Sequence, residues 1–209
     1  MKIRIKVCGI TRSEDALLAA ELGADAVGFV FHRPSPRYIE PAAAAAITAA
    51  LPGFVTTVGV FVDLEQEQVR RIAGEVHLDR VQLSGSEPPE YCSSLGLRWI
   101  KGFRLKTRED LGLIARYGSG RDFLLDSYVE GVPGGTGEKF NWEWAIEAGR
   151  HGRIILAGGL AADNVARAIK TAMPSAVDVS SGVEKSPGIK DRTKMAAFIR
   201  AALNCNELS

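Results

Sequence analysis

Several features are scarce in this chain of 209 residues, and each absence argues against a class of protein. The three cysteines, Cys8, Cys92 and Cys205, are scattered, odd in number and without C-x-x-C spacing. A disulfide framework and a structural zinc site are therefore not expected. No apolar run approaches the roughly 20 residues that a membrane helix needs. The formal net charge of +1 lacks the basic excess that is typical of a nucleic-acid-binding surface.

What is present is ordinary for a globular protein, with 46% hydrophobic and 24% charged residues. The N-terminus enters a strand-like pattern at Lys2-Ile3-Arg4-Ile5, with no signal-peptide hydrophobic region before it. We therefore expect one cytoplasmic α/β domain over residues 1–209, with neither a nucleic acid nor a membrane as partner.

Strand and helix signals alternate eight times, with no break in composition that would mark a linker. Strands are expected at residues 3–7, 25–31, 55–62, 80–83, 98–103, 123–126, 153–157 and 176–179. Helices are expected at residues 13–22, 41–51, 65–74, 88–95, 107–117, 141–149, 161–173 and 191–203. This pattern predicts a single (β/α)8 TIM barrel. A doubly wound open sheet is the competing architecture, but the G-x-G-x-x-G turn that it usually carries after its first strand is absent.

Alternate positions in several predicted strands differ in polarity. One set is apolar and is expected to face the helices: Ile5, Val7, Val58, Val60, Val81, Leu83, Phe123, Leu125, Val177 and Val179. The other set is expected to point into the barrel: Lys6, Cys8, Gln82, Ser84, Leu124, Asp126 and Asp178. Because a buried charge without a partner is costly, Lys6 is predicted to contact Asp178 or Gln82 across the barrel.

Cys8 follows the first strand and Asp126 ends the sixth, so a barrel would bring both to its C-terminal mouth. A thiol with a pKa of about 8.5 and a carboxyl with one of about 4 can act as base and acid if the site tunes both toward neutrality. Taken alone, Cys8 fits a small buried apolar residue equally well, and Asp126 fits the start of a turn. Cys92 and Cys205 lie in predicted helices and are expected to be packing residues.

Glycine-rich turns follow the seventh and eighth strands, at Gly158-Gly159-Leu160 and Ser180-Ser181-Gly182. In barrels these two loops commonly hold a phosphate through backbone N–H groups. Gly158, Gly159, Ser181 and Gly182 are therefore phosphate-binding candidates. Arg37 lies in a proline-stiffened loop after the second strand and is a candidate for gripping a carboxylate, although a lone loop arginine is more often solvated.

Motifs spread over nearly the whole chain resemble the phosphoribosylanthranilate isomerase family. In chain order they are Lys6-Val7-Cys8-Gly9-Ile10-Thr11, Gly28-Phe29-Val30-Phe31, Ser35-Pro36-Arg37-Tyr38-Ile39, Val58-Gly59-Val60-Phe61-Val62, Val81-Gln82-Leu83, Leu124-Leu125-Asp126-Ser127, Gly134-Gly135-Thr136-Gly137, Leu156-Ala157-Gly158-Gly159-Leu160, Asp178-Val179-Ser180-Ser181-Gly182-Val183-Glu184 and Pro187-Gly188-Ile189-Lys190-Asp191. The resemblance implies an isomerase of tryptophan biosynthesis. Its reaction is an Amadori rearrangement of N-(5-phosphoribosyl)anthranilate to 1-(2-carboxyphenylamino)-1-deoxyribulose 5-phosphate.

The same resemblance implies a role for each candidate residue. Asp126 is the general acid for the ribose ring oxygen, and Cys8 is the general base for the C2′ proton. Arg37 holds the anthranilate carboxylate, while the two glycine turns hold the phosphate. Further contacts to the substrate are implied for Gln82, Ser84, Gly135 and Asp178. No metal or organic cofactor is implied. The oligomeric state is left open between a monomer and a homodimer.

One position departs from the family pattern, because Ser84 stands where the family usually has histidine. By strand parity Ser84 points into the mouth, so we expect catalysis to survive with altered substrate binding. Three alternatives are weighed against this interpretation. A related sugar-phosphate isomerase of histidine biosynthesis would also be a barrel, but with an acidic residue at the end of the first strand, where this chain has Cys8. A non-catalytic phosphate-binding barrel would make Ser84 a mark of lost activity, and an indole-forming lyase would need a strand-end lysine, which Lys101 does not match.

Overall fold

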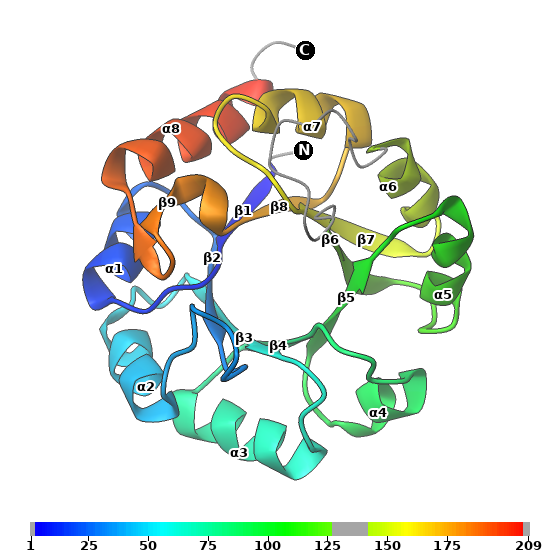
Figure 1. Cartoon of the computed structure of the whole chain (residues 1–209), viewed down its shortest axis with the longest axis horizontal. Helices are drawn as coiled ribbons and strands as arrows, with labels where there is room; N and C mark the ends of the chain where they lie inside the picture. Colours follow the sequence, from blue (N-terminus) through cyan, green and yellow to red (C-terminus); the bar gives the residue numbers. More distant parts are fainter. Residues whose placement is uncertain (1–2, 127–141, 207–209) are drawn as a thin grey trace.

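The protein is described by a computed structural model that covers residues 3–126 and 142–206. Its parallel strands form a closed barrel in the order β1 to β8, with helices around the outside (Figure 1). The strands are β1 Arg4–Val7, β2 Ala26–Val30, β3 Thr56–Phe61, β4 Arg80–Leu83, β5 Trp99–Arg104, β6 Arg121–Asp126, β7 Gly152–Ala157 and β8 Ala176–Val179. The helices are α1 Ser13–Glu21, α2 Pro41–Ala50, α3 Gln66–Val76, α4 Pro89–Ser94, α5 Leu111–Ala115, α6 Trp142–Ala148, α7 Val165–Ala172 and α8 Arg192–Leu203. The predicted (β/α)8 barrel is confirmed.

The ring closes where β1 pairs with β8, and this pairing sets Lys6 beside Asp178. Element order agrees with the sequence prediction, whereas several helix ends differ by a few residues. Asp191 is not the first residue of α8 but its N-cap, and its carboxylate accepts a hydrogen bond from the Lys194 backbone N–H at 2.9 Å. The predicted helix at 107–117 begins with a 3-10 turn, η1 Arg108–Asp110, before α5.

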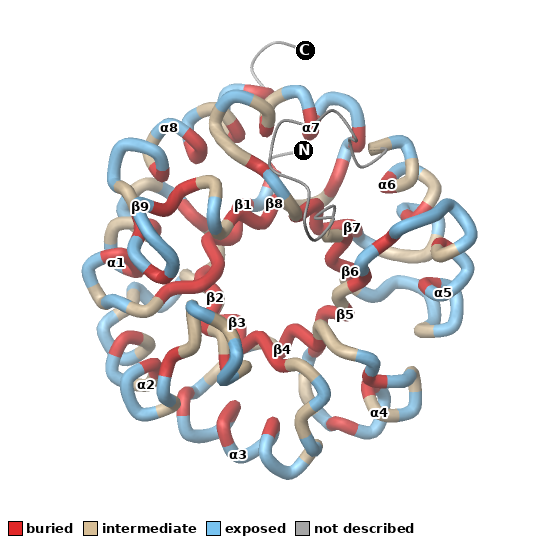
Figure 2. Tube along the Cα trace, viewed as in Figure 1, coloured by how far each residue is buried: buried red, intermediate tan, exposed pale blue. Residues whose placement is uncertain are grey.

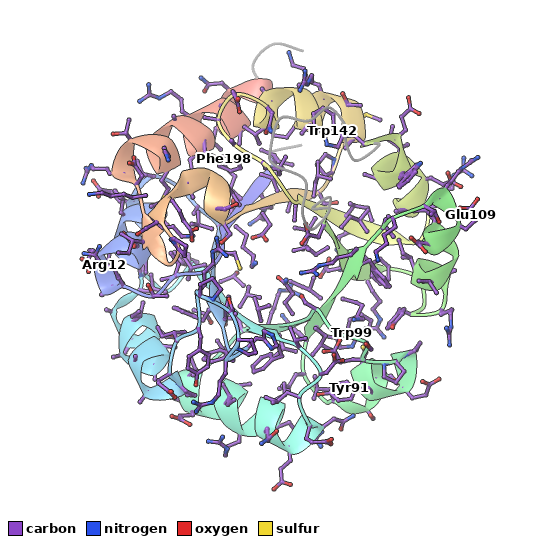
Figure 3. The ribbon with its side chains drawn as sticks, viewed as in Figure 1. Arg12, Tyr91, Trp99, Glu109, Trp142 and Phe198 are labelled. Carbon is purple, nitrogen blue, oxygen red and sulfur yellow. The ribbon has the colours of Figure 1, made fainter. Side chains whose placement is uncertain are left out.

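Two layers of side chains fill the molecule. The larger core lies between strands and helices, and the buried stretches of each helix face inward in Figure 2. Among the residues labelled in Figure 3, Trp99 and Phe198 are buried in this core, while Arg12 and Glu109 are exposed. A smaller apolar cluster fills the barrel interior and consists of Val58, Ile100, Leu124, Ile155 and Ala157. The interior of the barrel is therefore filled by apolar side chains below its C-terminal end.

The prediction that Val58 and Val60 face the helices is wrong. Val58 belongs to the interior cluster, and Val60 lines the cavity at the mouth. The helix-facing positions of β3 are instead Gly59 and Phe61: a Cβ on Gly59 would lie 2.4 Å from Leu78 Cδ1 and 2.8 Å from the Phe61 ring. Because β3 carries apolar residues at both parities, alternation alone does not show which face points outward. The crowding at Gly59 shows it, because the outer face leaves no room for a side chain at this position.

A small hairpin follows the eighth strand and was not predicted. After the 3-10 turn η2 Ser181–Val183, the antiparallel strands β9 Glu184–Ser186 and β10 Ile189–Lys190 fold beside the barrel mouth and lead into α8 (Figure 1). A last turn, η3 Asn204–Asn206, follows α8. In the part of the chain that the structure describes, no helix has the length and apolar character that a membrane span requires.

Candidate active site

A cavity of about 670 Å³ lies at the C-terminal end of the barrel. It is lined by these predicted site residues: Cys8, Arg37, Gln82, Ser84, Asp126, Gly158, Gly159, Asp178 and Ser181. Gly182 lies outside the lining, and Gly135 falls outside the described residues. A second hollow of about 570 Å³ runs between the loop after β2 and α3, but it contains neither Cys8 nor Asp126. The first cavity is thus the one in which the predicted chemistry converges.

Cys8 leaves β1 directly into this cavity, and its backbone N–H donates to the Val179 carbonyl at 2.8 Å. Gly28 on the neighbouring β2 makes room for the thiol, since a Cβ there would lie 2.8 Å from Cys8 Sγ. Burial raises the pKa of the Cys8 thiol, and the Lys6 and Lys190 ammonium groups oppose that rise. The thiolate fraction therefore grows as the pH increases past the ordinary range for a thiol.

Lys6 is buried and bonded as predicted. Its Nζ donates to Asp178 Oδ1 at 2.9 Å and to Gln82 Oε1 at 3.0 Å, which confirms the expected partners. Gln82 Nε2 in turn donates to Ser84 Oγ at 3.0 Å. Burial lowers the pKa of Lys6, but attraction to Asp178 and Cys8 outweighs it, and the net pKa lies above the ordinary value. A charged Lys6 thus fixes a polar chain that crosses the mouth from β8 to β4.

Asp126 ends β6 at the cavity rim, with its side chain 30% exposed. The backbone register pairs it with Arg104 at the end of β5, and the Arg104 Nε lies 4.0 Å from its carboxylate. The sequence pattern does not indicate Arg104 as a site residue. Proximity to both cavity and solvent suits a carboxyl group that exchanges protons during turnover.

The turns after β7 and β8 lie against each other. Gly158 and Gly159 have φ angles of +80° and +61°, a left-handed conformation that glycine adopts most readily. At Gly182 a Cβ would lie 1.9 Å from the Leu160 carbonyl oxygen, so only glycine fits there. Gly182 acts by letting the two turns approach, while Gly158, Gly159 and Ser181 form the cavity wall.

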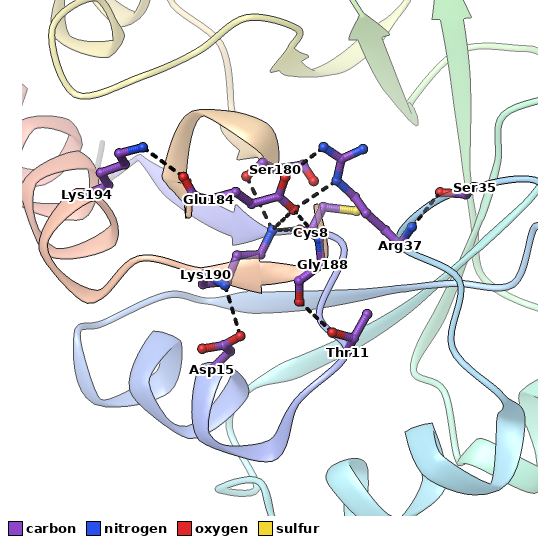
Figure 4. A network of polar contacts seen from close by, with 10 residues as sticks. All are labelled: Cys8, Thr11, Asp15, Ser35, Arg37, Ser180, Glu184, Gly188, Lys190 and Lys194. Atoms are coloured by element: carbon purple, nitrogen blue, oxygen red, sulfur yellow. Dashed lines mark hydrogen bonds and ion pairs between the residues drawn. The ribbon is translucent and has the colours of Figure 1, made fainter. Parts of the chain in front are cut away.

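Arg37 already contacts a carboxylate of its own chain. Its Nε donates to Glu184 Oε1 at 2.9 Å and its Nη2 to Glu184 Oε2 at 2.7 Å (Figure 4). The sequence does not predict the bidentate contact with Glu184, which it presents only as part of a family motif. Since Arg37 also lines the cavity, its side-chain N–H groups that have no partner among the described residues can donate to a ligand there.

Lys101 and the other two thiols lie outside this chemistry. Lys101 Nζ is buried on the outer side of the sheet, where it pairs with Glu87 Oε2 at 2.8 Å. It therefore does not provide the strand-end lysine that an indole-forming lyase needs. Cys92 and Cys205 are buried free thiols that do not line the cavity. Within residues 3–126 and 142–206, no group of three or more His, Cys, Asp and Glu side chains could hold a metal.

Comparison with known proteins gives a consistent result. The family model for N-(5′-phosphoribosyl)anthranilate isomerase matches residues 5–201. A relative of that name from Geobacter sp. strain M21 is 53% identical and covers 95% of this chain and 97% of its own. The phosphoribosyl anthranilate isomerase structure from Thermotoga maritima superposes with a TM-score of 0.87 at 42% identity, covering 96% of this chain and 98% of its own. A structure of the isomerase in complex with reduced 1-(o-carboxyphenylamino)-1-deoxyribulose 5-phosphate gives a TM-score of 0.84 at 40% identity, covering the same shares.

Proposed function

The chain belongs to the N-(5′-phosphoribosyl)anthranilate isomerase family, and we propose that Cys8 and Asp126 carry out the family's Amadori rearrangement in this protein. The substrate is N-(5-phosphoribosyl)anthranilate, and the product is 1-(2-carboxyphenylamino)-1-deoxyribulose 5-phosphate, a step of tryptophan biosynthesis. The observation that carries the residue assignment is that a thiol and a carboxyl share one cavity with two turns suited to phosphate.

Binding comes first and uses the two ends of the substrate. The phosphate lies against the backbone N–H groups of the turns at Gly158-Gly159 and Ser181, as in other barrels. The anthranilate carboxylate accepts hydrogen bonds from the N–H groups of Arg37 that Glu184 leaves available. The ribose then spans the mouth beside Gln82 and Asp178, whose positions Lys6 fixes.

Proton transfer then follows in two steps. Asp126 protonates the ribose ring oxygen, the C1′–O bond breaks, and the nitrogen lone pair forms a Schiff base at C1′. The Cys8 thiolate removes the C2′ proton, and the electron pair of that C–H bond forms the enolamine, which tautomerises to the ketone. One proton is given and one is taken, so the isomerisation balances without a cofactor.

The first test is a fluorescence assay that follows phosphoribosylanthranilate consumption. Cys8→Ala and Asp126→Asn should each lower kcat by about 10²–10⁴-fold, the usual contribution of an acid or base. Cys92→Ala is the matched control, because it removes a buried thiol from α4 that does not line the cavity. Retention of wild-type turnover by either active-site variant would reject its assigned role.

The pH dependence of Cys8 alkylation by iodoacetamide gives a second measure of this residue. The thiolate is the reactive form, and burial raises the pKa of the thiol, so in a Cys92→Ala/Cys205→Ala protein the alkylation rate should still be increasing at pH values above about 8.5. Turnover does not report this pKa alone, because Asp126 must be protonated while Cys8 is ionised, and the two requirements oppose each other as pH changes. An alkylation rate that is already constant from pH 7 upward would contradict the raised pKa.

A non-catalytic phosphate-binding barrel is the second candidate, favoured only by Ser84 in the cavity wall. It predicts a wild-type protein that binds the reduced product analogue but does not turn over. The alternative of a histidine-pathway isomerase is tested by assaying this protein in parallel with the aminoaldose substrate of that enzyme.

Location and assembly belong to the same proposal. We infer a cytoplasmic protein that binds a small molecule and no nucleic acid, as a monomer or a homodimer. One comparison structure is of monomers generated from the dimeric Thermotoga maritima enzyme, so both states are compatible with this fold. Sedimentation velocity on the purified chain decides between them.

A further inference from the structure

The hairpin after β8 places two buried charges behind the cavity. Glu184 and Lys190 have relative exposures of 7% and 5%, although they come from a short excursion beside the mouth. Burying such groups is costly unless each one is paired and hydrogen-bonded. Their contacts therefore indicate what the hairpin does.

The Glu184 carboxylate accepts hydrogen bonds from four donors, which are Arg37 Nε, Arg37 Nη2, Lys190 Nζ and the Gly188 backbone N–H (Figure 4). Burial raises the pKa of Glu184, but its bonds to Arg37 and Lys190 outweigh burial and hold the pKa below its ordinary value. Three of these donors contact Oε1 and one contacts Oε2, so the carboxylate is held in place as an ionised acceptor with no proton to donate. Its contact with Arg37 is geometric, because two parallel bonds fix the plane of the guanidinium.

Lys190 holds the other side of this arrangement. Its Nζ donates to Glu184 Oε1 at 3.0 Å, to the Cys8 carbonyl at 2.5 Å and to the Ser180 carbonyl at 3.3 Å. Its backbone N–H donates to Asp15 Oδ2 in α1 at 3.0 Å. One buried ammonium thus joins the exits of β1 and β8 to the hairpin.

We propose that Glu184 and Lys190 are a positioning pair, in which Glu184 orients the Arg37 guanidinium toward the carboxylate of the substrate and Lys190 fixes Glu184 and the backbone at Cys8. The inference rests on the proposed function of the cavity and adds two residues to it. Neither residue touches the reacting atoms. Both act through residues that line the cavity, Arg37 and Cys8.

The direction in which KM changes in Glu184→Gln distinguishes an effect of charge from an effect of orientation. Arg37, Lys190 and Glu184 together carry a net charge of +1, and Glu184→Gln would raise it to +2. If only charge mattered, the anthranilate carboxylate would bind more tightly and KM would fall. If orientation of Arg37 matters, KM rises, because an amide cannot accept from both Arg37 donors.

We expect Glu184→Gln to raise KM by about tenfold with kcat changed less than about threefold. Arg37→Ala should raise KM as well, and adding Glu184→Gln to it should have no further effect, since the two residues act as one unit. Lys194→Met is the control, because Lys194 Nζ contacts only the backbone carbonyl of Glu184 at 2.8 Å among the contacts of the described residues. An unchanged or lower KM, or an effect that persists fully in the Arg37→Ala background, would overturn the role of Glu184.

Two further variants keep the test decisive. If Glu184→Gln does not fold, Glu184→Asp retains the charge on a shorter side chain and should give an intermediate KM; a wild-type KM there rejects the proposal. Lys190→Met should lower kcat as well as raise KM, because it releases the Cys8 carbonyl. Unchanged kcat in a folded Lys190→Met protein would remove Lys190 from the pair.

Calorimetric binding of the reduced product analogue separates this inference from the proposed function. Wild-type protein that neither turns over nor binds the analogue rejects the proposed function and the inference that rests on it. Wild-type binding together with equal binding by Glu184→Gln rejects the positioning role alone. Weaker binding by Glu184→Gln supports it, whatever the rate of turnover.

Discussion

Ser84 shows how one side chain changes the wall of a cavity without touching its acid or base. Its hydroxyl accepts from Gln82 Nε2, and Gly102 on β5 lies opposite, where a Cβ would come within 2.9 Å of Ser84 Oγ. Ser84→His fills part of the mouth and replaces one hydrogen bond, a change of roughly 1 kcal/mol in binding. We expect KM to change by about three- to tenfold in steady-state assays, and kcat by less.

The control for Ser84→His is Ser86→His, two residues along the same loop, with an exposed side chain outside the cavity. A large loss of kcat in Ser84→His at unchanged KM would show that this wall takes part in proton transfer. A higher KM in Ser84→His would mean that serine keeps the pocket open for the substrate. A lower KM would mean that serine makes a weaker contact with the substrate than histidine does.

At single positions, the sequence predicts contacts between side chains on the same face of the strands, but not a contact made by a loop that is distant in the sequence. Lys6 was matched to Gln82 and Asp178 because a buried ammonium needs acceptors on the same inner face. The partner of Arg37 was not predicted, since Glu184 lies 147 residues away in a segment outside the β-α alternation. Pro187-Gly188 is a turn signal that would have indicated the hairpin.

The pairing of β1 with β8 closes the barrel, and the ion pair of Lys6 with Asp178 lies inside that seam. Removing one partner of a buried pair leaves the other charge without compensation. Lys6→Met should therefore reduce the free energy of unfolding by about 3–5 kcal/mol in urea titrations followed by circular dichroism. The double variant Lys6→Met/Asp178→Leu should recover much of that loss.

Arg4→Ala serves as the reference for the seam, because the Arg4 side chain is 71% exposed and its ion pair with Asp25 lies at the rim. Such surface pairs contribute about 0–1 kcal/mol. A Lys6→Met protein no less stable than Arg4→Ala would mean that the seam does not depend on its buried charges.

Among the strands, parity was informative only where one face carries polar residues. It assigned the inward residues of β1, β4 and β8 correctly, as Lys6, Gln82 and Asp178 show. In β3, Val58 faces inward against the prediction. Leu78 packs against the outer face of this strand, where Gly59 has no side chain to collide with it. Tertiary packing, rather than local pattern, fixes the direction of such a strand.

At the scale of the whole molecule, the cavity exists only when the barrel is closed. Its lining comes from the ends of strands far apart in the sequence, from Cys8 after β1 to Asp178 in β8. A ligand of this cavity thus binds the folded chain and not the unfolded one. Binding should stabilise residues 1–209 as one domain, which we propose to be a single unfolding unit.

The reduced product analogue at about 100 times its Kd should add about 2.7 kcal/mol to stability, which for a chain of this size raises Tm by roughly 5–10 °C. Thermal melts followed by tryptophan fluorescence and by circular dichroism measure the shift. Inorganic phosphate and anthranilate, each offered alone, should give smaller shifts because each occupies one end of the cavity. Two separate transitions, only one of them moved by the analogue, would contradict a single domain, and no shift at saturation would contradict a cavity built from the whole ring of strands.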